Sequence, residues 1–314
     1  MKNKVIFMGT PEFAIPSLGA LIQADYEIVS IVTQPDRKSG RGELVSSSPV
    51  KKYALVNKLK LFQPETLKDE KALDYISNLK PHLIIVVAYG LLVPPEILSI
   101  PESGCLNVHP SHLPRYRGSS PIATAILNGD EVTGVTIMLM DKGLDTGPLL
   151  AQRKESIAKE DSTGSLTTRL AKAGAQLLID TIPPWISGEI RPVPQDETKV
   201  VYTRVIAKED GRINWNSTAL EVWRRIRAFD PWPGCYTWWQ GKRLKINKAV
   251  PLEGGISGQT GKVVSLADAT SVGVMTRDGI LGLLEVQLEG KRSMSLQEFI
   301  RGHRDFVGSI LISD

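Results

Sequence analysis

Short apolar runs alternate with helix-like segments over the first two hundred residues of the chain. Apolar runs of about four to eight residues bounded by turn residues are typical of buried strands, whereas apolar positions spaced three or four apart are typical of helices. Strands are therefore expected at 4–8, 27–32, 83–88, 106–108 and 135–140. Helices are expected near 13–23, 50–57, 67–77 and 165–185, with another that opens at Ser120-Pro121. This alternation predicts an α/β domain with a mostly parallel sheet covered by helices on both faces.

The pattern changes after a segment at 188–198 that contains two prolines and few large apolar residues. Beyond it lie short alternating runs that favour strands at 242–250, 261–266, 271–277 and 280–288, with helices at 218–228 and 295–303. Several short strands with turn signals between them are typical of a small barrel, and an OB-like β-barrel is the preferred form. We therefore predict an N-terminal domain at 1–189, a linker at 190–207 and a smaller C-terminal domain at 208–314.

Composition narrows the class of protein. The 314 residues are 42% hydrophobic and 23% charged, which is ordinary for a globular domain. The chain has no apolar window long enough to cross a membrane and no signal-peptide pattern at its start, so a cytoplasmic protein is expected. The two cysteines, Cys105 and Cys235, argue against a disulfide framework and against a thiolate metal site.

The net positive charge of +4 arises entirely from the second part of the chain. Residues 1–203 contain 22 Lys+Arg and 22 Asp+Glu, whereas residues 204–314 contain 16 Lys+Arg and 12 Asp+Glu. This distribution suits a polyanionic partner such as RNA, although an ordinary solvated surface would look the same.

Three polar residues follow apolar runs that resemble buried strands. Asn107 and His109 end the run at 104–109, and Asp145 follows the run at 134–140. Ligands of parallel sheets gather at the carboxyl ends of the strands, so these side chains are expected to lie together. They match the needs of acyl transfer to an amine: an amide that stabilises an oxyanion, an imidazole that carries a proton, and a carboxylate that orients the imidazole.

Alternatives exist for His109 and Asp145. A hydrogen-bonded histidine of the core is the alternative interpretation of His109. His109 and His112 have the i, i+3 spacing of two metal ligands on a helix, but prolines at 110 and 114 break any helix there and no third ligand is near, so no metal is expected. Either Asp141 or Asp145 is able to cap the glycine-rich turn at 141–147, and the sequence does not decide which of the two meets His109.

Two further segments suggest contact with nucleic acid. The irregular stretch at 33–49 contains Arg41 between two glycines, which allows the arginine to reach a phosphate or a base; a solvated loop is the alternative. Aromatic residues are dense at 228–239, just after three arginines, and either stack on RNA or, as the favoured interpretation, pack into a small core.

Taken together, several motifs closely resemble the methionyl-tRNA formyltransferase family, over essentially the whole chain. The motifs are Gly-Thr-Pro-x-Phe at 9–13, Thr-Gln-Pro-Asp-Arg with Gly-Arg-Gly at 33–42, Val-Ala-Tyr-Gly at 87–90, Asn-x-His at 107–109, Pro-Arg-Tyr-Arg-Gly at 114–118, Asp-x-Gly-Leu-Asp-Thr-Gly at 141–147, Gln-Asp-Glu at 195–197 and Phe-x-Pro-Trp-Pro at 229–233. The chain departs from the family at His112, where relatives usually have leucine, and at Glu43-Leu44, where they often have lysines.

The resemblance implies a Rossmann-like N-terminal domain, an OB-like C-terminal barrel and 10-formyltetrahydrofolate as the formyl donor. It implies an enzyme that formylates the α-amine of initiator Met-tRNA as a monomer in the cytoplasm, without a metal and away from membranes. Asn107, His109 and Asp145 would be catalytic. The residues expected at the folate are Ser111, His112, Leu113, Pro114, Tyr89, Gly90 and Asp141, and those expected at the tRNA are Arg37, Lys38, Arg41, Arg204 and Lys208.

Two other classes of function stay open at this level. A formyltransferase with another acceptor, such as a sugar nucleotide or glycinamide ribonucleotide, or a formyl-folate hydrolase, would share the catalytic residues. An RNA-binding module with a degenerate α/β domain would leave those residues unexplained.

Overall fold

The chain divides into two units, which are described separately. The structure is a computed structural model that describes residues 2–39, 44–252, 258–266 and 272–313. Unit 1 consists of Met1–Pro121, Val132–Ser156 and Thr167–Thr203, and unit 2 consists of Ile122–Glu131, Ile157–Leu166 and Arg204–Asp314.

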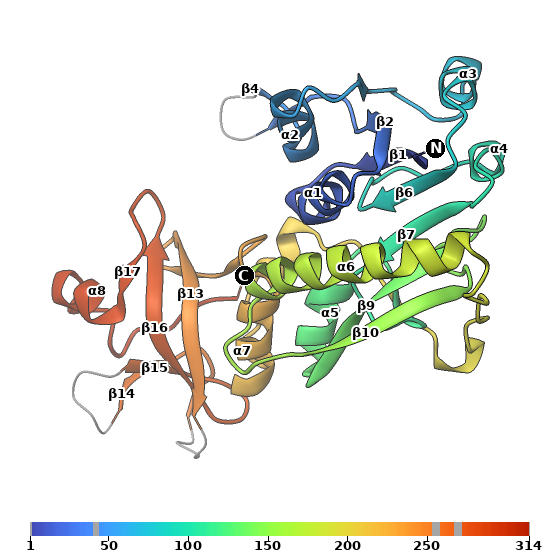
Figure 1. Cartoon of the computed structure of the whole chain (residues 1–314). Coiled ribbons are helices and arrows are strands. Elements are labelled where there is room, and N and C mark those ends of the chain that lie inside the picture. The colour runs from blue at the N-terminus through green and yellow to red at the C-terminus, as the bar shows by residue number, and fades with distance from the viewer. Residues whose placement is uncertain (1, 40–43, 253–257, 267–271, 314) are drawn as a thin grey trace. The chain divides into compact units, whose positions relative to one another are not determined.

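Unit 1 is built on a seven-stranded sheet with the order β10-β9-β7-β6-β1-β2-β5 (Figure 1). Its strands are β1 (Lys4–Gly9), β2 (Glu27–Val32), β5 (Leu61–Phe62), β6 (Leu83–Val87), β7 (Cys105–His109), β9 (Val132–Leu139) and β10 (Leu149–Ser156). The strands from β7 to β5 are parallel to one another, whereas β9 is antiparallel to both β7 and β10. The predicted α/β class with a mostly parallel sheet is confirmed.

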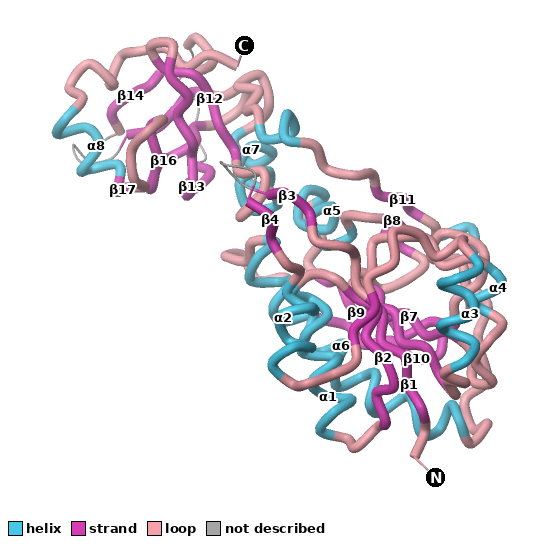
Figure 2. Tube along the Cα trace, turned by 90° about the horizontal axis from the view of Figure 1, so that it is seen from above, coloured by secondary structure: helices cyan, strands magenta, loops and turns pink. Residues whose placement is uncertain are grey.

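Helices cover both faces of this sheet (Figure 2). Unit 1 contains α1 (Ile15–Gln23), α2 (Pro49–Val56), α3 (Glu70–Asn78), α4 (Pro95–Leu98) and most of α6 (Thr163–Ile186), whereas α5 (Pro121–Asn128) falls almost wholly in unit 2. On one face, α3 and α4 pack against alternate apolar residues of the central strands, Cys105 of β7 among them. On the other face, a Cβ on Gly174 of α6 would lie 2.8 Å from Val108 Cγ1, so this glycine lets the helix approach the sheet closely. Because side chains alternate along a strand, Asn107 and His109 share the face of Cys105.

Unit 2 contains an antiparallel sheet with the order β12-β13-β16-β15-β14, curled into a half-barrel, with β17 beside β16. Its elements are α7 (Ala219–Ala228), β12 (Cys235–Trp239), β13 (Lys242–Leu252), β14 (Val263–Ser265), β15 (Val272–Met275), β16 (Ile280–Leu288), β17 (Met294–Ser295) and α8 (Leu296–Gly302). The segment 308–312 lies between the two edges of this sheet: Leu311 N donates to Gly261 O at 2.8 Å, and Ile312 N donates to Trp238 O at 3.0 Å. The predicted barrel-like second domain is confirmed.

The dense aromatic segment lies mainly in the core of unit 2. Phe229 and Trp239 are buried, and Trp239 packs edge-on against Phe299 and Phe306. The interpretation as core packing is therefore confirmed for these side chains, whereas Trp232 is exposed.

Several short strands of unit 1 have too little apolar periodicity to be recognised in the sequence. They are β3 (Arg37–Ser39), β4 (Leu44–Ser46), β8 (Arg115–Gly118) and β11 (Val201–Thr203). β11 pairs in parallel with β8, and Val193 pairs with Leu149 at the start of β10. Residues up to Thr203, within the segment expected to be a linker, thus pack as part of unit 1.

Candidate active site

Asn107, His109 and Asp145 converge in unit 1. The Asp145 Oδ2 atom lies 3.6 Å from His109 Nδ1, and Asn107 Nδ2 donates to Asp145 Oδ1 at 3.4 Å. His109 is 4% exposed, and only 12% of the Asp145 side chain is exposed. The amide, the imidazole and the carboxylate therefore form one compact and largely dry cluster, in which Asp145 is the acid that faces His109.

The orientation of the imidazole is set by its other nitrogen. His109 Nε2 lies 2.9 Å from the carbonyl oxygen of Tyr116, which accepts hydrogen bonds only, so Nε2 carries a proton. Tyr116 has a left-handed backbone with φ 63°, which turns its carbonyl towards the ring. Nδ1 is consequently the ring atom able to exchange a proton, and it faces Asp145.

The carboxylate of Asp145 is held by its own loop and by β8. Asp145 has a left-handed backbone with φ 54°, and its Oδ2 atom accepts a hydrogen bond from Gly118 N at 2.8 Å. Gln195 Nε2 donates to the carbonyl oxygens of Asp145 and Gly147 at 2.8 and 2.7 Å. A Cβ at Gly147 would lie 1.8 Å from Leu139 O, so the turn closes only with glycine there.

Two residues of this arrangement were not assigned a role from the sequence. Arg117 has no exposed surface, and its Nε and Nη2 atoms donate to Gln195 Oε1 at 3.1 and 3.0 Å. Its guanidinium also pairs with Glu197, with 2.7 Å between Nη2 and Oε1, which lowers the pKa of that carboxyl. The Gln-Asp-Glu motif was the available signal, but it lies in the predicted linker.

The segment 111–114 is held by a buried polar network. Thr136 Oγ1 donates to Ser111 O at 2.7 Å and accepts from Leu113 N at 3.2 Å, and Gln152 Nε2 donates to Leu113 O at 2.8 Å. Ser111 is itself buried, and its hydroxyl donates to Arg115 O at 2.6 Å. The backbone of this segment is thereby fixed.

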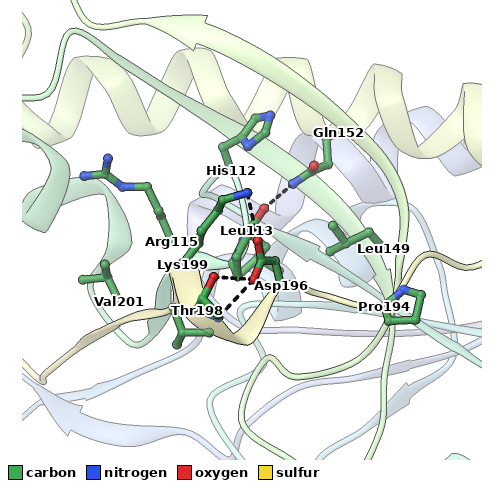
Figure 3. A pocket seen from close by; sticks show the side chains of 12 residues that line it. His112, Leu113, Arg115, Leu149, Gln152, Pro194, Asp196, Thr198, Lys199 and Val201 are labelled. Carbon is green, nitrogen blue, oxygen red and sulfur yellow. Dashed lines mark hydrogen bonds and ion pairs between the residues drawn. The ribbon is translucent and has the colours of Figure 1, made fainter.

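A cavity of about 740 Å³ lies beside the same segment (Figure 3). Residues from three parts of unit 1 line it: His112, Leu113, Pro114, Arg115, Leu149, Gln152, Pro194, Asp196 and 198–201. Partial burial lowers the pKa of His112, and the Lys154 ammonium lowers it further. The ring therefore lines the cavity mainly in its uncharged form at neutral pH.

The other residues expected at the folate do not line this cavity. Tyr89 is buried, its pKa is raised to about 12 by desolvation, and its hydroxyl has no partner among the described residues. Gly90 follows it with φ 86°. Asp141 is exposed and caps its own turn, since its Oδ1 atom accepts from Gly143 N and Thr146 Oγ1.

The residues expected at the tRNA lie in both units. Arg37 is exposed on β3, while Arg41 lies outside the described residues, as does the side chain of Lys38. Arg204 is exposed and pairs with Asp210 in unit 2, with 2.6 Å between Nη2 and Oδ1, and Lys208 is exposed nearby.

The described residues contain no group of three or more His, Cys, Asp or Glu side chains placed to hold a metal ion. Within the same ranges, no helix is both long and apolar enough to span a bilayer.

Comparison with known proteins identifies the family. The family model described as "Formyl transferase" matches residues 1–182, and "Formyl transferase, C-terminal domain" matches residues 205–304. The methionyl-tRNA formyltransferase of Caldanaerobacter subterraneus subsp. tengcongensis is 44% identical over 98% of this chain and 99% of its own length. That of Thermodesulfovibrio yellowstonii is 43% identical over 97% of each chain. The chain belongs to the methionyl-tRNA formyltransferase family.

Solved structures of more distant proteins share the fold. WlaRD, a sugar 3N-formyl transferase, aligns with a TM-score of 0.67 at 21% identity and covers 93% of this chain and 100% of its own. HypX from Aquifex aeolicus, solved in complex with tetrahydrofolic acid, aligns with a TM-score of 0.64 at 18% identity and covers 96% of this chain and 48% of its own. Membership of the methionyl-tRNA formyltransferase family makes this chain a one-carbon transferase.

Proposed function

We propose that this chain transfers the formyl group of 10-formyltetrahydrofolate to the α-amino group of methionine on initiator Met-tRNA. Family membership supports the class of reaction. The single observation that supports the assignment of the site is the convergence of Asn107, His109 and Asp145, with 3.4 and 3.6 Å between the carboxylate and its two neighbours.

The attacking amine must be neutral. Free α-amino groups have a pKa of about 7.7–8.0, so a useful fraction is deprotonated near neutral pH. Attack forms a bond between the amine nitrogen and the formyl carbon, and a negative charge develops on the formyl oxygen. We assign Asn107 Nδ2 and, in the protonated ring, His109 Nδ1 as the donors to that oxygen, because both atoms lie at the carboxylate of Asp145, at 3.4 and 3.6 Å. The loss of one such donor typically lowers the rate by about 10²–10³.

Asp145 would manage the proton. In the tetrahedral intermediate the former amine carries an extra proton, and the bond between the formyl carbon and the folate nitrogen must break. The negative charge of Asp145 stabilises a protonated His109 before this transfer; Asp145 would then accept the proton from the former amine and return it to the departing nitrogen. General acid–base catalysis of this kind contributes about 10²–10⁴ in rate.

Substrate binding is assigned to the remaining residues that the sequence predicts. We propose that the donor contacts the fixed segment Ser111–Pro114 together with Tyr89, Gly90 and Asp141. The tRNA would contact Arg37, Lys38 and Arg41, and also Arg204 and Lys208. We further propose that residues 1–189 form the catalytic domain and 208–314 the tRNA-binding domain of a cytoplasmic monomer.

A direct assay tests the acceptor. Purified protein is given radiolabelled 10-formyltetrahydrofolate and either initiator or elongator Met-tRNA. We expect rapid label transfer to the initiator and little to the elongator. No transfer to either tRNA, with transfer to an amino sugar nucleotide or to glycinamide ribonucleotide, would reject the proposed acceptor. Donor hydrolysis without an acceptor would reject the transferase assignment.

A further inference from the structure

We propose that Gln195 and Arg117 are positioning residues that fix Asp145 for proton transfer. The inference rests on the proposed function, since it assumes that Asp145 is the acid that acts on the substrate. It starts from one contact: the side chain of Gln195 bridges the turn that contains Asp145.

The amide of Gln195 uses both of its hydrogens within this turn. Nε2 lies 2.8 Å from Asp145 O and 2.7 Å from Gly147 O. Asp145 has φ 54°, a backbone conformation that residues other than glycine rarely adopt. It persists only where the surroundings maintain it. The two hydrogen bonds hold the carbonyl on each side of Thr146, and so maintain the turn from which the carboxylate projects.

Arg117 fixes the orientation of the Gln195 side-chain amide. Two nitrogens of its guanidinium donate to Gln195 Oε1, which leaves Nε2 directed at the carbonyls of the turn. Glu197 balances the charge of Arg117, so a fully buried guanidinium is retained without an unpaired charge. Lysine has one point-like ammonium and does not reproduce this fork.

The neighbours of Arg117 on β8 contact the same cluster. Tyr116 O accepts from His109 Nε2, and Gly118 N donates to Asp145 Oδ2. Tyr116, Arg117 and Gly118 thus form hydrogen bonds to the His109 imidazole, the Gln195 amide and the Asp145 carboxylate, respectively. A shift of Arg117 would move all three contacts together.

The experiment compares Gln195→Leu and Gln195→Glu with the matched control Gln176→Leu. Gln176 lies exposed on α6, where its amide bonds to Asp180. Glutamate keeps an acceptor for Arg117 but loses both donors to the turn. Because misplacement of a catalytic group by about 1 Å costs up to about 10² in rate, we expect both Gln195 variants to lose about 10- to 100-fold in kcat. KM for donor and Met-tRNA should stay close to the parent values, as should all constants of the control.

A double variant separates positioning from general damage. If Gln195 acts through Asp145, Gln195→Leu combined with Asp145→Asn should be no slower than Asp145→Asn alone, because residues that act as a unit are not additive. Full kcat in both Gln195 variants, or losses that multiply in the double variant, would overturn the positioning role. Full turnover in Asp145→Asn would instead reject the proposed catalytic assignment. Should a Gln195 variant not fold, Arg117→Lys provides the same comparison, with a fall in kcat expected and full kcat counting against the proposal.

Discussion

Replacing Gly118 with alanine tests whether the close packing of β8 on β11 fixes the carboxylate of Asp145. Gly118 has φ 108°, and a Cβ there would lie 2.8 Å from Thr203 O and 2.9 Å from Thr203 Oγ1. The backbone conformation costs a residue other than glycine about 1–3 kcal/mol. Forcing a methyl group into a packed site costs about 1–3 kcal/mol more. The free energy of unfolding is thus expected to fall by about 2–6 kcal/mol, out of about 5–15 kcal/mol for a typical protein.

Thermal unfolding measures that loss, and Gly188→Ala is the matched control. Gly188 has φ 77°, but a Cβ there would meet no atom within 4 Å, so the control has the backbone cost without the steric clash. At about 2–4 °C per kcal/mol for a domain of this size, Tm should fall by roughly 4–24 °C in Gly118→Ala and by clearly less in Gly188→Ala. Turnover should fall only in Gly118→Ala, because its amide donates to Asp145 Oδ2. Equal Tm and turnover in the two variants would refute the reasoning.

Three further predictions concern the site and the charged surface. Asn107→Ala should lower kcat by about 10²–10³ with little change in the KM for Met-tRNA, and an equal loss of binding in steady-state kinetics would contradict its role as an oxyanion donor. Arg41→Ala should raise the KM for Met-tRNA and leave that for the donor unchanged; an unchanged KM for Met-tRNA would remove this arginine from the interface. The hydrogen bonds from Arg204 lower the pKa of Asp210 to about 2, below its ordinary 3.8. The stability that this pair contributes is therefore fully present at a pH above 3.8 and is lost as the pH falls through about 2. Arg204→Met should therefore lower Tm by clearly more at pH 6 than at pH 2, and an equal difference in Tm at both values would contradict the linkage.

The convergence of Asn107, His109 and Asp145 was predictable because the types of these residues and their positions beside apolar runs are local properties. Asn107 and His109 lie on one face of β7, as their spacing of two requires in a strand. The choice between Asp141 and Asp145 was not predictable from spacing, because both follow the same run. The structure separates them: Asp141 bonds to its own turn, and Asp145 bonds to Asn107 and Gly118.

The residues around the acid were not predictable because they depend on pairing between distant segments. Arg117 lies in a run without apolar alternation, and its burial arises only when Val201–Thr203 pairs with β8. Gln195 lies 50 residues beyond the carbonyl that it binds. A proline-containing segment with few apolar residues is typical of a linker, and nothing local distinguishes one that packs against a domain.

The direction of β9 changes the physical explanation of the site. The sequence argument placed Asp145 with His109 at the carboxyl edge of parallel strands, which is wrong, because β9 is antiparallel to β7 and its last residue, Leu139, pairs with Leu106. Asp145 therefore starts from the opposite end of β7 and reaches His109 only because the loop after β9 folds back along the strand. Such a loop needs contacts that hold its conformation, the fixed points of the loop, whereas a strand end is already held by the sheet. The left-handed backbone at Asp145, the closure at Gly147 and the bridge from Gln195 are those points, and the geometry of the acid consequently depends on contacts outside the sheet.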